Sequence, residues 1–355
     1  MRHIESFMRH LPEGIDAALI TSPENRQYLT GMHSSAGVVV VTRNQSYFLI
    51  DFRYIEAARE RVRGMEVVLL EKMQRQLSEI FARHGVERVG VEESFMSLSD
   101  FASYQKSFPT LEFVEKSGVS GVLSALRMRK DEGELRCIRQ AQEITDAGFA
   151  HILDYICPGR TERDIALELE FFMRRMGSEG TAFDFIVVSG KNSSLPHGVP
   201  TGKAVEKGDF VTMDFGGVVD GYRSDMTRTV AVGEIDDEQR RVYDTTLSAQ
   251  LAALSAIKAG ESCAKIDKIA RDIIDGAGYQ GCFGHGLGHS VGLFIHEEPR
   301  LSPGCQAVLE PGVLMTVEPG IYLEGRFGVR IEDLVVVRED GAENLTKSPK
   351  KLIVL

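Results

Sequence analysis

Residues 209–232, DFVTMDFGGVVDGYRSDMTRTVAV, contain the pattern that decides the fold of the C-terminal part of the chain. Apolar residues surround Asp214 and follow Asp225, and Asp220-Gly221 between them is a strong signal for a two-residue β-turn. A hairpin closed at this turn places Asp214 opposite Thr227. Because Thr227 and Asp225 share a face, Asp214 and Asp225 form a diagonal pair on that face, roughly 7 Å apart at Cβ or less.

Two carboxylates this close repel each other unless a shared proton or a metal ion lies between them. The alternative is that both aspartates are solvated on an exposed face. The neighbouring residues Val211, Met213 and Phe215 on one face, and the uncharged Thr212 on the other, favour a largely buried strand instead. The hairpin therefore predicts a site for a proton or a cation.

Two glutamates are embedded in apolar, β-rich sequence further along the chain. Glu318 ends the run 313–317, and Glu332 lies within 329–337. Burying such a charge is costly unless it is paired or bound to a metal. Arg330 shares a predicted strand face with Glu332, so a Glu332–Arg330 ion pair is an alternative to a metal site.

Three of the nine histidines, His285, His289 and His296, fall within or just after a glycine-rich stretch at 284–292. The stretch matches neither a dinucleotide fingerprint nor a phosphate-binding loop, and His296-Glu297 is not followed by the second histidine of a zinc helix. Glycines let the backbone approach a ligand closely, so the cluster favours a binding site.

Four carboxylates and one histidine are what a pair of divalent ions requires. Ligands that are mostly oxygen favour Mn²⁺, with Co²⁺ or Zn²⁺ as alternatives. Two such ions would hold a bridging hydroxide for attack on a carbonyl or phosphoryl centre, and the spacing alone leaves open which centre is attacked.

The chain has 355 residues, which predicts about two domains. Its first part alternates strand and helix patterns, typical of a small α/β domain, and shows no cluster of chemically active residues. We therefore interpret it as a structural or oligomerising domain, and we place the boundary between residues 1–122 and 123–355. The predicted strands are 17–20, 37–41, 47–50, 67–70 and 89–91, and the predicted helices are 54–62 and 75–84.

The second part repeats a helix pair followed by a strand pair, which predicts two similar halves with a cleft between them, although the halves share no sequence identity. Ligand sites favour such interfaces. Thr161 and Asp164 resemble a capping box at the start of one helix. The predicted elements are helices from about 123 to 156, 161–176, 237–259 and 263–276, and strands 183–189, 209–232 as a hairpin, 313–317 and 329–337.

Composition excludes several classes of protein. With 52 acidic and 41 basic residues the formal charge is −11, which argues against nucleic acid or an anionic membrane as the main partner. Five dispersed cysteines without a C-x-x-C pair indicate neither a disulfide framework nor a zinc-thiolate site, and they fit a reducing cytoplasm. No apolar run approaches the ~20 residues that cross a bilayer.

Taken together, the motifs resemble those of the pita-bread metallopeptidases, a superfamily that includes prolidase, aminopeptidase P and methionine aminopeptidase. The resemblance implies a dinuclear site with Asp214, Asp225, His289, Glu318 and Glu332 as its ligands. The motifs are Asp214-Phe215-Gly216-Gly217, residues 222–229, His285-Gly286-Leu287-Gly288-His289, His296-Glu297, Glu318-Pro319-Gly320 and Arg330-Ile331-Glu332-Asp333.

Within this superfamily, Leu195-Pro196-His197-Gly198 and the N-terminal residues 25–31 resemble the proline-specific branch of Xaa-Pro dipeptidases and Xaa-Pro aminopeptidases. The resemblance implies a creatinase-like N-terminal α/β domain followed by an α+β pita-bread catalytic domain with pseudo-twofold halves. Creatinase shares the fold but lacks the metal ligands, which are complete here.

The implied reaction is hydrolysis of an Xaa-Pro bond in a dipeptide or short peptide by a metal-bridging hydroxide. Glu318 would relay the proton to the leaving nitrogen, and His296 would stabilise the oxyanion. His285 and His197 would line the substrate subsites, and Arg330 would orient Glu332. Family analogy also allows a homodimer. The alternative is a non-catalytic peptide-binding module that keeps the fold, and the choice between dipeptidase and aminopeptidase stays open.

Overall fold

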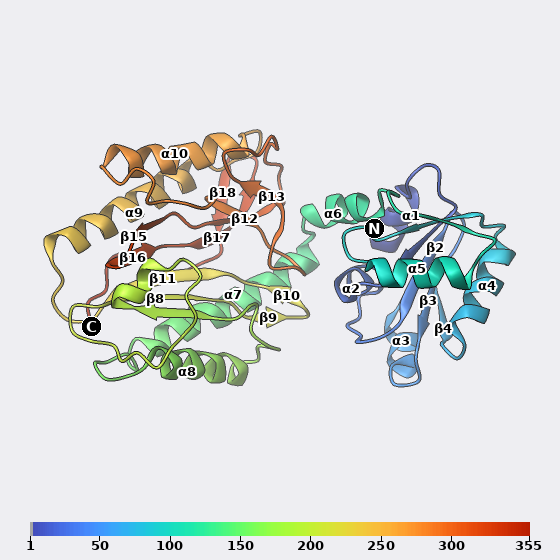
Figure 1. Ribbon diagram of the computed structural model, residues 1–355, viewed down its shortest axis with the longest axis horizontal. Coiled ribbons are helices and arrows are strands. Elements are labelled where there is room, and N and C mark those ends of the chain that lie inside the picture. Colours follow the sequence, from blue (N-terminus) through green and yellow to red (C-terminus); the bar gives the residue numbers. More distant parts are fainter. Residues whose placement is uncertain (1–2) are drawn as a thin grey trace. The chain divides into compact units, whose positions relative to one another are not determined.

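The structure is a computed structural model that describes residues 3–355. The chain forms two compact units, which divide after Arg127 (Figure 1). The predicted boundary, between residues 122 and 123, falls within helix α6 (Val119–Met128). None of the helices found in residues 3–355 is both long enough and apolar enough to cross a membrane.

The first unit is built on a six-stranded sheet. Its strands are β1 (Ala17–Ile20), β2 (Val38–Thr42), β3 (Ser46–Ile50), β4 (Glu66–Leu69), β5 (Arg88–Val91) and β6 (Glu112–Val114). Their order is β4-β3-β2-β1-β5-β6, in which β1, β2 and β3 are antiparallel and the outer strands join in parallel. The helices are α1 (His3–Arg9), α2 (Pro23–Thr30), α3 (Ile55–Arg61), α4 (Met73–Arg83), α5 (Leu98–Ser107) and α6.

Hydrophobic periodicity explains why this unit folds as it does. β2 and β3 are buried along their whole length, and α4 presents Leu77, Ile80 and Phe81 to the sheet. The predicted strands and helices of this unit are confirmed, with ends shifted by one or two residues. Helices α1, α2 and α5 and strand β6 were not predicted, because short amphipathic segments give a weak periodic signal.

The second unit contains two similar halves. Its helices are α7 (Glu132–Ile152), α8 (Glu162–Arg175), α9 (Asp237–Ala256) and α10 (Cys263–Gly276), with a 3₁₀ turn η1 (Gly190–Ser194). Its strands are β7 (Ile186–Ser189), β8 (Phe210–Phe215), β9 (Val218–Val219), β10 (Tyr222–Arg223), β11 (Met226–Ala231), β12 (Gly288–Ser290), β13 (Glu297–Leu301), β14 (Leu314–Val317), β15 (Gly320–Leu323), β16 (Phe327–Arg330), β17 (Asp333–Arg338) and β18 (Gly341–Asn344).

Each half pairs two helices with a three-stranded sheet. Helices α7 and α8 share a core with the sheet β11-β8-β7, and α9 and α10 share a core with β14-β17-β18. The two helix pairs lie on opposite sides of the strands (Figure 1). This arrangement confirms the predicted α+β domain of two similar halves. Helix α8 begins at the predicted capping box of Thr161 and Asp164.

The hairpin has the predicted register. Asp214 in β8 lies opposite Thr227 in β11, and Tyr222 lies opposite Val219 near the tip. Asp220 and Gly221 have φ of 47° and 75°, the positive values that a type I′ turn requires.

One predicted strand is two strands in the structure. The run 329–337 is divided between β16, which pairs with β15, and β17, which pairs with β14. Glu332 therefore lies in the connection rather than inside a strand. The sequence could not show the break, because the point where a strand changes partner depends on strands far away in the sequence, which local periodicity does not encode.

Candidate metal centre and substrate pocket

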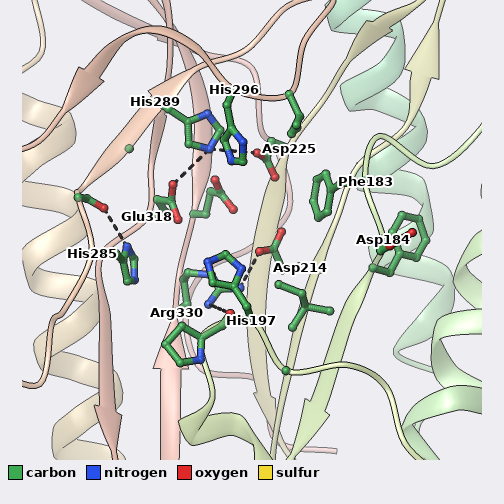
Figure 2. A pocket seen from close by; sticks show the side chains of 18 of the residues that line it. Phe183, Asp184, His197, Asp214, Asp225, His285, His289, His296, Glu318 and Arg330 are labelled. Atoms are coloured by element: carbon green, nitrogen blue, oxygen red, sulfur yellow. Dashed lines mark hydrogen bonds and ion pairs between the residues drawn. The ribbon is translucent and has the colours of Figure 1, made fainter. Parts of the chain in front are cut away.

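The second unit contains a cavity of about 610 Å³. All nine residues predicted for the site line it, and they come from segments more than 100 residues apart in the sequence (Figure 2). The nine are His197, Asp214, Asp225, His285, His289, His296, Glu318, Arg330 and Glu332.

The strands of both halves deliver the five predicted metal ligands. Asp214 is near the end of β8, Asp225 directly precedes β11, and Glu318 directly follows β14. His289 lies in β12, and Glu332 lies between β16 and β17. Rigid strands on both sides of the cavity thus fix the carboxylates and the imidazole before any ligand binds.

The ligand atoms of Asp225, His289 and Glu332 all lie within 4.8 Å of one another. His289 Nε2 is 3.7 Å from Asp225 Oδ2 and 3.5 Å from Glu318 Oε1. Figure 2 shows His289 facing Asp225 and Glu318 across the cavity. Asp214 completes the group, and its buried Oδ1 accepts no hydrogen bond from residues 3–355.

Burial makes simultaneous ionisation of these carboxylates unfavourable. It raises the pKa of Asp225 and of Glu332 well above the usual range, and the charges of neighbouring carboxylates add to the effect. Burial likewise raises the pKa of Glu318 to about 8. A bound cation would remove this penalty, which is what a buried acidic cluster with an unpartnered oxygen requires.

The histidine of the cluster is in the form that binds metals. Burial lowers the pKa of His289 to about 3, and the neighbouring His296 contributes to the shift, so the imidazole of His289 is neutral. Its Nδ1–H donates a hydrogen bond to the carbonyl oxygen of Ser290, with Nδ1 3.1 Å from that oxygen, so the ring lone pair is on Nε2. This nitrogen is the atom that faces Asp225 and Glu318. The donor set therefore fits divalent cations.

Arg330 pairs with Asp214, whereas the alternative that the sequence left open was an ion pair with Glu332. Its Nη2 lies 2.6 Å from Asp214 Oδ2, and its Nε donates to Thr227 Oγ1 at 3.0 Å. Thr227 Oγ1 in turn donates to Glu332 Oε2 at 2.7 Å. Arg330 thus contacts Asp214 directly and reaches Glu332 through Thr227.

Two further histidines of the predicted site, His296 and His285, lie beside the acidic cluster. His296 stacks edge-on against His289 with ring centroids 4.5 Å apart. The hydroxyl of Tyr322 donates to His285 Nε2 at 2.8 Å, because His285 Nδ1 donates to the carbonyl oxygen of Gly286, and it accepts a hydrogen bond from Arg330 Nη1 at 2.9 Å. Tyr322 was not predicted, because a tyrosine in an apolar strand looks like an ordinary core residue.

A buried cluster of four carboxylates and a neutral histidine, placed between two similar α+β halves, defines a metal-dependent hydrolase of the pita-bread fold. Residues 136–339 match the model of metallopeptidase family M24, and residues 8–129 match the creatinase/prolidase N-terminal domain. The chain belongs to metallopeptidase family M24.

Relatives resemble the chain over nearly its whole length. An uncharacterised peptidase of Bacillus subtilis, YqhT, is 42% identical over 96% of both chains, and an Xaa-Pro dipeptidase of Pyrococcus furiosus is 36% identical over 99% of both. Among solved structures, an Xaa-Pro dipeptidase from Bacillus anthracis superposes with a TM-score of 0.94 at 41% identity, covering 99% of this chain and 98% of that one. An X-Pro aminopeptidase from Thermotoga maritima gives 0.91 at 38% identity, covering 98% and 99%.

Proposed function

We propose that this metallopeptidase hydrolyses the Xaa-Pro bond at the N-terminus of dipeptides or short peptides. The observation that carries the proposal is the convergence of Asp214, Asp225, His289, Glu318 and Glu332 in one cavity. Relatives with Xaa-Pro dipeptidase and Xaa-Pro aminopeptidase activity in their names support the choice of substrate.

These five residues would hold two divalent cations. The ligands are mostly oxygen, which supports Mn²⁺, with Co²⁺ or Zn²⁺ as alternatives. When bound, such ions lower the pKa of water and polarise a carbonyl group.

The chain's own residues would bind the peptide and move its protons. Glu318, which accepts a hydrogen bond from Thr316 Oγ1 at 3.3 Å, would take a proton at its carboxylate and pass it to the leaving proline nitrogen. His296, which packs edge-on against His289 and lines the cavity, would donate a hydrogen bond to the developing oxyanion. His197 and His285 would contact the peptide on either side of the scissile bond.

The cavity supports a small, partly apolar substrate. Its volume of about 610 Å³ is in the ordinary range for a small-molecule site. Phe183, Ile295 and Val199 contribute apolar surface to its lining, on which a proline ring can pack. The cationic Arg300 also lines it and can meet a peptide carboxylate.

Activity measurements after chelation test the proposal. Hydrolysis of Ala-Pro should disappear when the protein is treated with a chelator and should return when Mn²⁺ is added. Asp225→Ala should abolish hydrolysis under both conditions, because it removes a ligand. Asp272→Ala, which removes an exposed carboxylate paired with Lys268, is the matched control and should keep full activity. Hydrolysis that survives both chelation and Asp225→Ala would overturn the proposal.

We further propose, by family analogy, that the protein is a homodimer. We also propose that it is located in the cytoplasm, because its dispersed cysteines fit a reducing compartment. All five cysteines are free thiols, as expected in a reducing compartment. Sedimentation of the purified protein tests the assembly. Comparing Ala-Pro with a longer Xaa-Pro peptide separates a dipeptidase from an aminopeptidase.

A further inference from the structure

Glu162 is a fully buried carboxylate in the first turn of α8 that lies outside the metal cluster. Its Oε1 accepts hydrogen bonds from the amide and hydroxyl of Ser189 at 2.7 and 3.0 Å. Its Oε2 accepts from the amide and hydroxyl of Thr201 at 3.0 and 2.5 Å. Asn192 Nδ2 donates to both oxygens, at 3.0 and 3.3 Å.

Ser189 and Thr201 are at the two ends of one loop, and Asn192 lies within it. Ser189 is the last residue of β7, and Thr201 is where the chain returns to contact α8. Between them, Pro196, His197 and Val199 line the substrate cavity. One side chain therefore ties the start of the pocket loop, residues 190–200, to its end, and this reduces the conformational freedom of the loop.

The charge of Glu162 suits this task. Each hydrogen bond to a carboxylate is stronger than its neutral counterpart, and each oxygen here serves one end of the loop. Lys203 Nζ donates to Ser189 Oγ at 3.0 Å and pairs with Asp209 at 2.6 Å, which adds positive charge on the Ser189 side. In Glu162→Gln, an NH₂ group replaces one of the two acceptor oxygens. The donors at one end of the loop then lose their acceptor, and that end of the loop is released.

The middle of the loop is attached to the metal cluster. Arg330 Nη1 donates to the carbonyl oxygen of Pro196 at 3.1 Å while its Nη2 holds Asp214. Ser193 Oγ accepts a hydrogen bond from the backbone amide of Gly328 at 2.9 Å. In Figure 2, His197 lies beside Asp214 and Arg330. His197, next to Pro196, is thus held by contacts at the middle of the loop and by the Glu162 hydrogen bonds at its two ends.

We infer that Glu162 is a positioning residue that holds His197 in the substrate site by closing the pocket loop at both ends. The inference rests on the proposed Xaa-Pro peptidase function, because His197 is placed there as a substrate contact. Glu162 itself touches none of the predicted ligands through a hydrogen bond described for residues 3–355.

Kinetics of Glu162→Gln test the inference. We expect kcat/KM for Ala-Pro to fall about 10-fold to 100-fold, as displacement of a substrate-orienting group predicts. Bound manganese, measured by elemental analysis, should stay at the wild-type level. The matched control is Glu92→Gln in the first unit, a fully buried carboxylate that accepts hydrogen bonds from Ser22 and Asn25. It should lower the melting temperature to a similar extent and leave kcat/KM within about twofold of wild type, with all variants assayed well below their melting temperatures.

A double-mutant cycle with His197→Ala separates positioning from general stability. If Glu162 acts through His197, Glu162→Gln should cost little further activity once His197 is alanine. Thr201→Val, which removes one hydroxyl donor and keeps the amide, should show the same coupling more weakly and decides the question if Glu162→Gln does not fold.

The outcomes are distinguishable. A wild-type protein that hydrolyses no Xaa-Pro peptide with Mn²⁺ overturns the proposed function itself. An active wild type with unchanged kcat/KM in Glu162→Gln and Thr201→Val, or with losses fully additive to that of His197→Ala, overturns the positioning role alone.

Discussion

Lys130 supports the candidate site from a position that its sequence context does not reveal. Its Nζ lies 2.9 Å from Glu297 Oε2 and 3.1 Å from Ser290 Oγ, and both charged side chains are almost fully buried. Ser290 follows His289 in β12, and Glu297 follows His296 at the start of β13. One buried ammonium therefore joins β12, which carries His289, to the start of β13, which His296 directly precedes.

Replacing this lysine should leave a buried carboxylate without its cation. Lys130→Met keeps most of the side-chain volume, so the expected loss is electrostatic, about 3–5 kcal/mol of the free energy of unfolding. Urea denaturation followed by circular dichroism measures it. The control is Lys268→Met, which removes an exposed pair with Asp272 and should cost under about 1 kcal/mol. Equal losses in the two variants would show that the Lys130 pair is no stronger than a surface pair.

The sequence predicted the polar residues of the candidate site but not the hydrogen bonds that connect them. Asp214 and Asp225 could be paired because a turn signal fixed their register, and every predicted residue lines the cavity. The hydrogen-bonding roles of Thr227, Tyr322 and Glu162 were not predicted. Their roles come from hydrogen bonds to segments far away in the sequence, and no local pattern marks such contacts.

The hairpin of β8 and β11 depends on a glycine directly after β8. A Cβ on Gly216 would lie 1.9 Å from the carbonyl oxygen of Ser224. Only a residue without a side chain lets the two strands approach here, and this approach brings Asp214 toward Asp225.

We expect Gly216→Ala to separate the two aspartates. The clash is with backbone, so it must be relieved by moving a strand, at a cost of about 1–3 kcal/mol of the free energy of unfolding or more. Manganese content and Ala-Pro hydrolysis should both fall. Gly276→Ala, in α10 with open space around its Cα, is the control and should change neither. Full metal content in Gly216→Ala would show that the hairpin does not set the ligand geometry.

Elements with strong local signals could be predicted, and those defined by their pairing partners could not. Helix α10 begins and ends at the predicted residues, because its apolar stripe has a clear helical period. The division of 329–337 into β16 and β17 depends on pairing with β15 and β14, which sequence periodicity does not encode.

The duplication of the second unit was visible as a repeated order of helices and strands without any repeated sequence. The reason is physical: each half needs two helices to cover one face of its sheet, and many apolar residues satisfy that packing. The ligands differ between the halves, so sequence comparison of the halves would not have revealed the shared centre.

Metal binding should stabilise the whole second unit. Four of the 52 acidic residues converge on one cavity, where burial and mutual repulsion oppose their ionisation. Ions that bind only the folded state stabilise it by about 2.7 kcal/mol when present at 100 times their dissociation constant. The chelated protein should therefore melt several degrees below the protein with Mn²⁺. Differential scanning calorimetry measures the shift, and Asp225→Ala should abolish most of it, whereas Asp272→Ala should retain it. An equal Mn²⁺-dependent shift in wild type and Asp225→Ala would mean that the stabilising ion binds elsewhere on the molecule.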